Sequence, residues 1–74
     1  MPHGKMSSAS MLEAARRDVR DAEDRIRRQE AIVTEMEKAG QTEAAQLGRD
    51  LLGMMRSAFE LMRRHLERLE SGRR

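Results

Sequence analysis

Apolar residues recur at alternating spacings of three and four in the first part of the chain. This spacing places them on one face of a helix and is the heptad pattern of coiled coils. It predicts a long amphipathic helix over residues 10–39. The row contains Leu12, Val19, Ile26, Val33 and Met36, with Ala15, Ala22 and Gln29 between them.

A second row with the same spacing follows and predicts another helix over residues 43–70. At a rise of ~1.5 Å per residue, each helix would be roughly 40–45 Å long. Together the two rows form the seam along which the helices are expected to pack. The second row contains Ala45, Gly48, Leu52, Met55, Phe59, Met62, Leu66 and Leu69.

Local signals mark the ends of both predicted helices. Ser10 and Glu13 have the S-x-x-E spacing of a capping box, which places the first helix start at residue 10. Gly40 tolerates the left-handed conformation that ends many helices, and Thr42 is a favourable N-cap for the second helix. A turn confined to residues 40–42 makes the two helices antiparallel neighbours.

The segments outside the helices are predicted to be tails. Residues 1–9 contain the only proline and show no periodicity, which is typical of a disordered N-terminal segment. Residues 71–74 follow the second helix and are expected to extend into solvent. The sequence therefore predicts one all-α domain, an antiparallel two-helix hairpin over residues 10–70.

The second helix carries another apolar stripe, displaced by roughly 100° around its axis from the seam. One partner helix cannot cover both stripes, and each large apolar side chain left in water forfeits on the order of 1.5–3 kcal/mol. The sequence therefore predicts an interface with another chain on this stripe. It contains Leu47, Leu51, Met54, Ala58 and Leu61, followed by His65.

Length and cysteine content favour the same conclusion. A chain of 74 residues buries little of its surface, and small domains need disulfides, a metal or oligomerisation for support. The chain has no cysteine, so oligomerisation remains. We expect two hairpins to form a homodimeric four-helix bundle. The alternative is a hairpin that docks its second helix on a different protein.

Candidate chemistry is sparse. His65 is preceded three positions earlier by Met62, so the Glu-x-x-His pattern of di-metal bundles is missing. We see no phosphate-binding loop and no nucleophile beside a base, so neither an enzyme nor a cofactor or metal site is expected. His65 is either a pH-sensitive group or an ordinary interface residue. The methionines suit core packing, although a pliable docking groove is an alternative.

Two positions inside the seam are unusual. Gln29 would need a hydrogen-bond partner if buried, where it could fix the register, or it would reach water at the edge of the seam. Gly48 costs ~1 kcal/mol relative to alanine inside a helix, and close approach of the two helices would compensate. Gly53 carries a similar cost, for which the sequence suggests no reason.

The charge balance argues against nucleic acid as the main partner. Charged residues make up 38% of the chain, yet the net charge is only +2, and one phenylalanine is the sole aromatic residue. Basic groups are in excess near both termini, at the open end of the hairpin, and residues 21–62 carry a net charge of −3. This polarity favours antiparallel docking of two hairpins. The candidate contacts to phosphates or acidic partners are Arg16, Arg17, Arg20, Arg63, Arg64 and Arg68.

Many of these charges also suit pairs within one helix, four residues apart, such as Glu23 with Arg27 and Glu60 with Arg64. No apolar run approaches the ~18 residues of a membrane span, and no leader segment is apparent. We therefore expect a cytoplasmic protein that does not enter the membrane.

A set of positions across residues 25–69 carries a resemblance to a known family. They are Arg25, Ile26, Arg28, Gln29, Glu37, Gly40, Thr42, Ala45, Leu51, Leu52, Met62, His65 and Leu69. With these residues the chain resembles a family of small uncharacterised helical-hairpin proteins from alphaproteobacteria. The resemblance implies the capped hairpin and a bacterial cytoplasmic setting, and it implies no activity. It also draws attention to His65.

Overall fold

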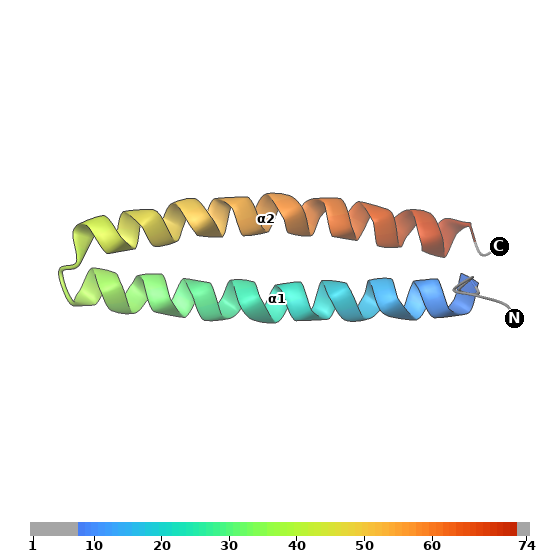
Figure 1. Ribbon diagram of the computed structural model, residues 1–74, viewed down its shortest axis with the longest axis horizontal. Helices are drawn as coiled ribbons and strands as arrows, with labels where there is room; N and C mark the ends of the chain where they lie inside the picture. The colour runs from blue at the N-terminus through green and yellow to red at the C-terminus, as the bar shows by residue number, and fades with distance from the viewer. Residues whose placement is uncertain (1–7, 73–74) are drawn as a thin grey trace, which may run out of the picture.

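The computed structural model describes residues 8–72, which form two α-helices joined by a short turn. Helix α1 spans Ser8–Lys38 and helix α2 spans Thr42–Ser71. The helices run antiparallel and side by side, so α1 begins and α2 ends at the same end of the molecule (Figure 1). The predicted all-α helical hairpin is confirmed, and its dimerisation stays a prediction.

The turn is built around Gly40, whose φ of +74° lies in the left-handed region that glycine adopts without strain. The Gly40 N–H donates to the carbonyl of Glu37 at 3.1 Å, and the Gln41 N–H donates to the carbonyl of Met36 at 2.9 Å. This pair of bonds is a Schellman motif, which satisfies carbonyls that the helix end leaves without partners. Gly40 therefore ends α1 in the way that the sequence predicted.

Helix α1 begins earlier than predicted. Ser8 and Ala9, expected in the N-terminal tail, belong to the helix, and its first turn contains no acidic residue. Ser10 and Glu13 therefore lie inside the helix and not at its start. The helix extends past Ser10 because alanine and serine continue a helical backbone at little cost. The remaining parts of the predicted tails, residues 1–7 and 73–74, lie outside the described residues.

Helix α2 begins directly after the Schellman motif. Gln41 occupies the N-cap position without a side-chain cap bond, and its carbonyl accepts the first helical hydrogen bond from Ala45 at 2.9 Å. Thr42, the predicted cap, is instead the first helical residue. The turn is short because the same residue, Gln41, completes the end of α1 and starts α2.

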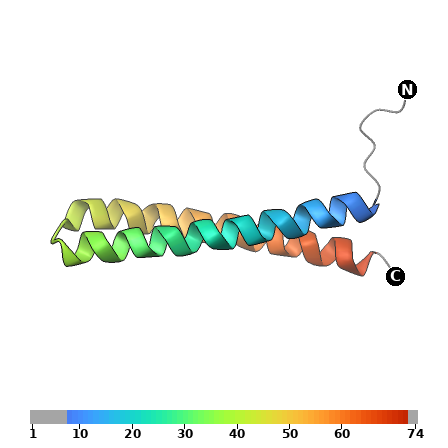
Figure 2. The ribbon, with the colours of Figure 1, turned by 90° about the horizontal axis from the view of Figure 1, so that it is seen from below.

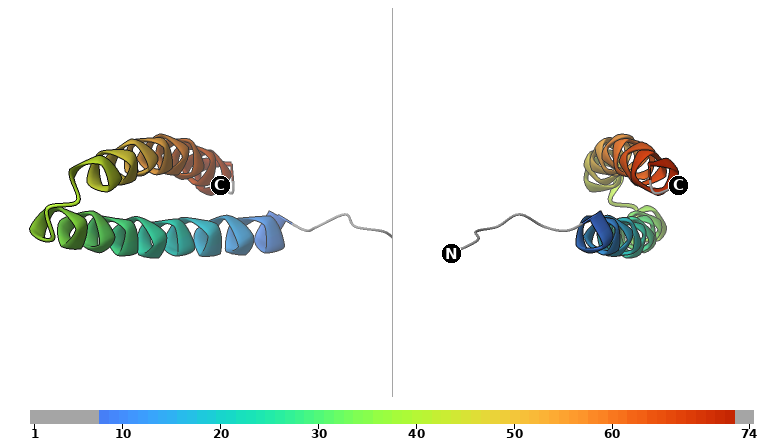
Figure 3. Two further views of the ribbon diagram at one scale, coloured as in Figure 1. Left: turned by 60° about the vertical axis from the view of Figure 1, so that its left-hand side comes forward. Right: turned by 90° about the vertical axis from the view of Figure 1, so that its right-hand side faces the viewer.

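The hairpin is a single layer. Its two helices cross at a shallow angle (Figure 2), and Figure 3 shows one helix stacked on the other, with no third element beside them among residues 8–72. Its Cα atoms extend over 55 × 27 × 14 Å. Each helix is therefore covered on one side only.

Burial along the seam follows from this single layer. Leu12, Val33 and Leu52 are buried, and three alanines of the seam are buried with them. The other predicted core side chains are only half-buried, because two helices enclose the seam from two directions rather than from all sides. The half-buried set is Val19, Ile26, Met36, Met55, Phe59, Met62, Leu66 and Leu69.

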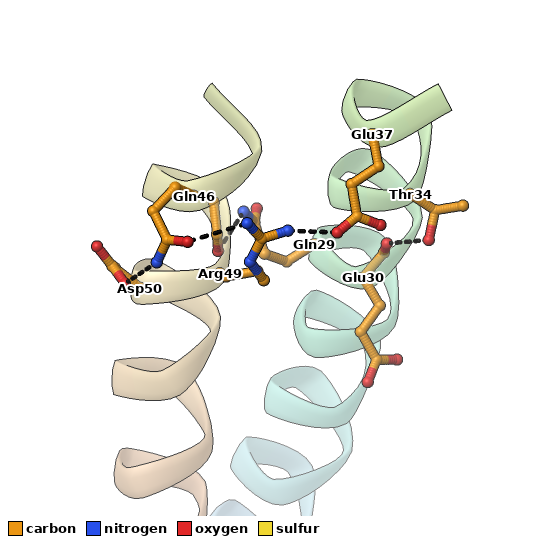
Figure 4. Close-up of polar contacts among 8 residues, drawn as sticks. Gln29, Glu30, Thr34, Glu37, Gln46, Arg49 and Asp50 are labelled. Atoms are coloured by element: carbon orange, nitrogen blue, oxygen red, sulfur yellow. Dashed lines mark hydrogen bonds and ion pairs between the residues drawn. The ribbon is translucent and has the colours of Figure 1, made fainter. Parts of the chain in front are cut away.

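The two helices lie close together at Gly48. A Cβ atom at this position would lie 2.8 Å from Cγ2 of Val33 and 3.3 Å from Nε2 of Gln29. Gln29 is half-buried, and its Nε2 donates to the Gly48 carbonyl at 3.2 Å (Figure 4). Its amide therefore has a protein partner on the facing helix. The predicted close approach at Gly48 is present.

Candidate functional site

One flank of the seam is lined by ion pairs between the two helices. Arg16 pairs with Glu70 at 3.4 Å, and two further pairs join Glu30 to Arg56 and Glu37 to Arg49. Successive members lie one or two heptads apart, so they occupy the same flank of each helix. Figure 4 shows Arg49 extending from α2 towards Glu37 of α1. We call this flank the ion-paired edge.

The sequence predicted pairs within helices but not the ion-paired edge. Within helices, Arg27 pairs with Asp24 at 3.3 Å rather than with Glu23. Glu60 pairs with Arg63 at 3.9 Å rather than with Arg64. The signal was present in the sequence: charged residues of opposite sign recur at heptad spacing on the two helices. The short turn fixes the register between α1 and α2, so these residues could have been paired.

Removing the pair between Glu30 and Arg56 is expected to change stability little. Both side chains are about half exposed, so solvent screens their attraction. In a double-mutant cycle of Glu30→Ala and Arg56→Ala, urea unfolding should give a coupling free energy below about 1 kcal/mol. A coupling of more than 2 kcal/mol would contradict this assignment and make the edge a main source of stability.

Large apolar side chains are exposed on a different face of α2. The exposed fractions are 71% for Leu47, 44% for Leu51, 64% for Met54 and 65% for Leu61. Their spacing places them in one row, which also contains the exposed Ala58. We call these five residues the apolar face. His65, also exposed, follows them in the same row.

Helix α1 adds two exposed apolar side chains that its heptad row does not include. Ile32 is 45% exposed and Met11 is 41% exposed. They lie three heptads apart, on the flank of the α1 seam opposite the ion-paired edge. The charged residues Asp18 and Arg25 occupy the heptad positions between them, so no continuous stripe is visible in the α1 sequence.

A hollow of about 250 Å³ opens beside Ala58, and apolar side chains form most of its wall. A second hollow of about 350 Å³ lies by Arg56 of the ion-paired edge and is lined mainly by charged residues. Ile26 and Phe59 line both hollows, so this layer of the seam is reached from either side. The lining of the first hollow is Ala22, Arg25, Ile26, Met55, Ala58, Phe59 and Met62.

The six arginines proposed as phosphate contacts lie near the start of α1 and the end of α2, at the same end of the hairpin (Figure 1). Arg16 pairs with Glu70, and Arg63 lies 3.9 Å from Glu60 and 3.8 Å from Glu67. Arg16 and Arg17 are consecutive in a helix and therefore project about 100° apart, as do Arg63 and Arg64. Arg17 and Arg20 are exposed on one face of α1, three residues apart, and Arg64 and Arg68 are exposed on one face of α2, where they line a hollow together with Glu67 and Ser71.

Among the side chains that the structure describes, no three His, Asp or Glu residues gather closely enough to hold a metal ion.

Compared with known proteins, the chain matches no family model, no curated protein and no solved structure. Over their described lengths, neither α1 nor α2 has an apolar stretch sufficient to cross a bilayer.

Proposed function

We propose that this protein is a non-enzymatic interaction module of the cytoplasm that works as a homodimer. Two hairpins pack through the apolar faces of their α2 helices and form a four-helix bundle. The observation that carries this proposal is the row of four large aliphatic side chains on α2, each 44–71% exposed in the single hairpin.

Burial of the apolar face supplies the driving force for association. Full burial of a Leu or Met side chain contributes about 1.5–3 kcal/mol, and a dimer buries this row on both copies. Soluble monomers rarely expose contiguous apolar patches of this kind, because such patches promote association. The half-buried side chains beside the face, such as Met55 and Met62, gain further cover from a second hairpin.

A second copy suits this face better than an unrelated partner. In a two-fold dimer the same patch meets itself, so every exposed residue of the apolar face gains a partner of the same apolar character. The charges agree with this arrangement. Residues 63–74 carry five arginines and two glutamates, and residues 21–62 carry an excess of three acidic groups. Opposed hairpins bring the basic end near the acidic part of the partner.

Light scattering coupled to size-exclusion chromatography tests the proposal. The purified chain is expected to elute with the mass of two chains and to dissociate only on strong dilution. A folded species with the mass of one chain would refute the homodimer. A poorly folded monomer that gains helicity on binding another protein would support the alternative, in which α2 docks on a different partner.

A further inference from the structure

Small and large side chains follow one another along the apolar row of α2 in an order that determines how two copies of the row can pack. From the turn outwards the row runs Ala44, Leu47, Leu51, Met54, Ala58 and Leu61, and Ala44 is half-buried whereas the others are exposed. When the rows of two copies pack antiparallel, each alanine lies opposite a leucine and Leu51 lies opposite Met54. When the two rows pack in parallel, each alanine lies opposite an alanine and each leucine lies opposite a leucine.

We infer that the two α2 helices of the dimer pack antiparallel, with Leu47 of each copy inserted beside Ala58 of the other. This inference rests on the homodimer proposed above and specifies its geometry. It assigns the apolar hollow next to Ala58 as the binding site for a leucine of the second copy. Because the dimer is two-fold symmetric, this contact between Leu47 and Ala58 occurs twice in it.

The hollow and the side chain that fills it are both present in the single hairpin. Leu47 is 71% exposed, the largest exposed fraction among the large apolar residues that the structure describes. The hollow of about 250 Å³ beside Ala58 is lined by Met55, Phe59 and Met62, which offer an apolar wall for an aliphatic side chain. Insertion would replace water in the hollow with close contacts, as in protein interiors.

A parallel dimer would leave this hollow unfilled. Leu47 and Ala58 are eleven residues apart, or about 16 Å along the helix axis. In parallel packing Leu47 therefore lies far from the hollow, and the small Ala58 side chain of the second copy faces it. The hollow would stay open within the interface, which costs dispersion contacts on every lining residue.

The register also follows from the residues at the end of the row. A heptad shift in the antiparallel dimer would place Leu47 against His65 and Ala44 against Arg68. Both contacts would put a polar or charged group at a position otherwise filled by an apolar side chain. The register with Leu47 beside Ala58 avoids this, because all six apolar residues of the row then meet apolar partners.

Cysteine cross-linking tests the inference cleanly, because the chain contains no native cysteine. Under native oxidising conditions, a mixture of Leu47→Cys and Ala58→Cys chains should form a disulfide-linked heterodimer, and either variant alone should not self-link. The Cβ atoms must approach within about 3.5–4.5 Å for this bond. Self-linking of Leu47→Cys would indicate parallel packing. Linking of Leu47→Cys with His65→Cys would indicate the shifted register. Either result would overturn the inference.

A second measurement avoids any change in the apolar face. A spin label on Glu67→Cys lies on an exposed part of α2, and its distance to the label of the other copy can be measured by electron paramagnetic resonance. The inferred register separates the two Cα atoms by about 40 Å along the axis, whereas parallel packing keeps them side by side. If light scattering shows a dimer but the distance between the labels is short, the antiparallel geometry is overturned and the homodimer stands. A monomer would overturn the homodimer as well.

Discussion

Replacing Leu51 and Met54 together by glutamate is expected to convert the dimer into separate hairpins. In the inferred register these two residues face each other across the two-fold axis, so the variant would bring four carboxylates together at the centre of the interface. Burial of an unpaired charge costs several kcal/mol, and like charges repel each other there. The dissociation constant should rise by at least about a thousandfold, which corresponds to ~4 kcal/mol. Light scattering across a dilution series measures this change.

A matched control adds the same charge elsewhere on α2. Gly53 and Ser57 are exposed, lie in the same segment of the helix and do not belong to the apolar face. Their double replacement by glutamate should leave the dimer intact. Dissociation of this control as well would mean that added negative charge, rather than the apolar face, controls assembly. A variant at Leu51 and Met54 that remains dimeric would place the interface on another surface.

The hydrophobic rows were sufficient to predict the fold of this chain. A heptad row on each side of one glycine specifies two amphipathic helices, and the short connection makes them antiparallel neighbours. The second stripe on α2 was visible for the same reason, because periodicity reveals which side chains share a face. Its large members, among them Leu47 and Met54, are exposed in the hairpin as the two-stripe argument requires.

The extent of burial could not be read from the same rows. A row identifies the face of a helix that packs, whereas the number of neighbouring elements determines how completely each side chain is covered. Phe59 and Leu66 belong to the seam but are only half-buried, because the described part of the chain has no third helix to close the single layer. The exposure of Ile32 could not be predicted for a related reason. Its exposure depends on the register between helices and not on an apolar stripe within α1.

Helix starts were predicted less well because the competing energies are small. A side-chain cap contributes typically about 1 kcal/mol, and a helix can begin without one when the preceding residues tolerate helical backbone angles. Ser8 and Ala9 meet that condition, so α1 extends past the predicted capping box at Ser10. At the other helix, the backbone bonds around Gly40 fix Gln41 at the start of α2, and Thr42 becomes helical instead of capping.

Replacing Gly48 by alanine is expected to destabilise the protein although alanine is the better helix former. The added Cβ would lie 2.8 Å from Cγ2 of Val33, closer than carbon atoms pack. Val33 is β-branched and has one strongly preferred rotamer in a helix, so it cannot move aside. Separation of the helices would also weaken the hydrogen bond from Gln29 to the Gly48 carbonyl. Overpacking typically costs 1–3 kcal/mol, and the gain in helix propensity offsets about 1 kcal/mol of this.

Gly53 provides the matched control on the same helix. Apart from the chain neighbours and the backbone of α2 itself, no atom would lie within 4 Å of a Cβ at Gly53, so Gly53→Ala should raise the free energy of unfolding by about 0.5–1 kcal/mol. Urea unfolding of both variants at one protein concentration keeps the contribution of dimerisation comparable. Val33→Ala should cost less stability in the Gly48→Ala chain than in the original chain, because in that variant it also removes the clashing methyl groups. If the two glycine variants were equally stabilising, contact between the helices at Gly48 would be looser than described, and the close approach that sets the register of the hairpin would lie elsewhere.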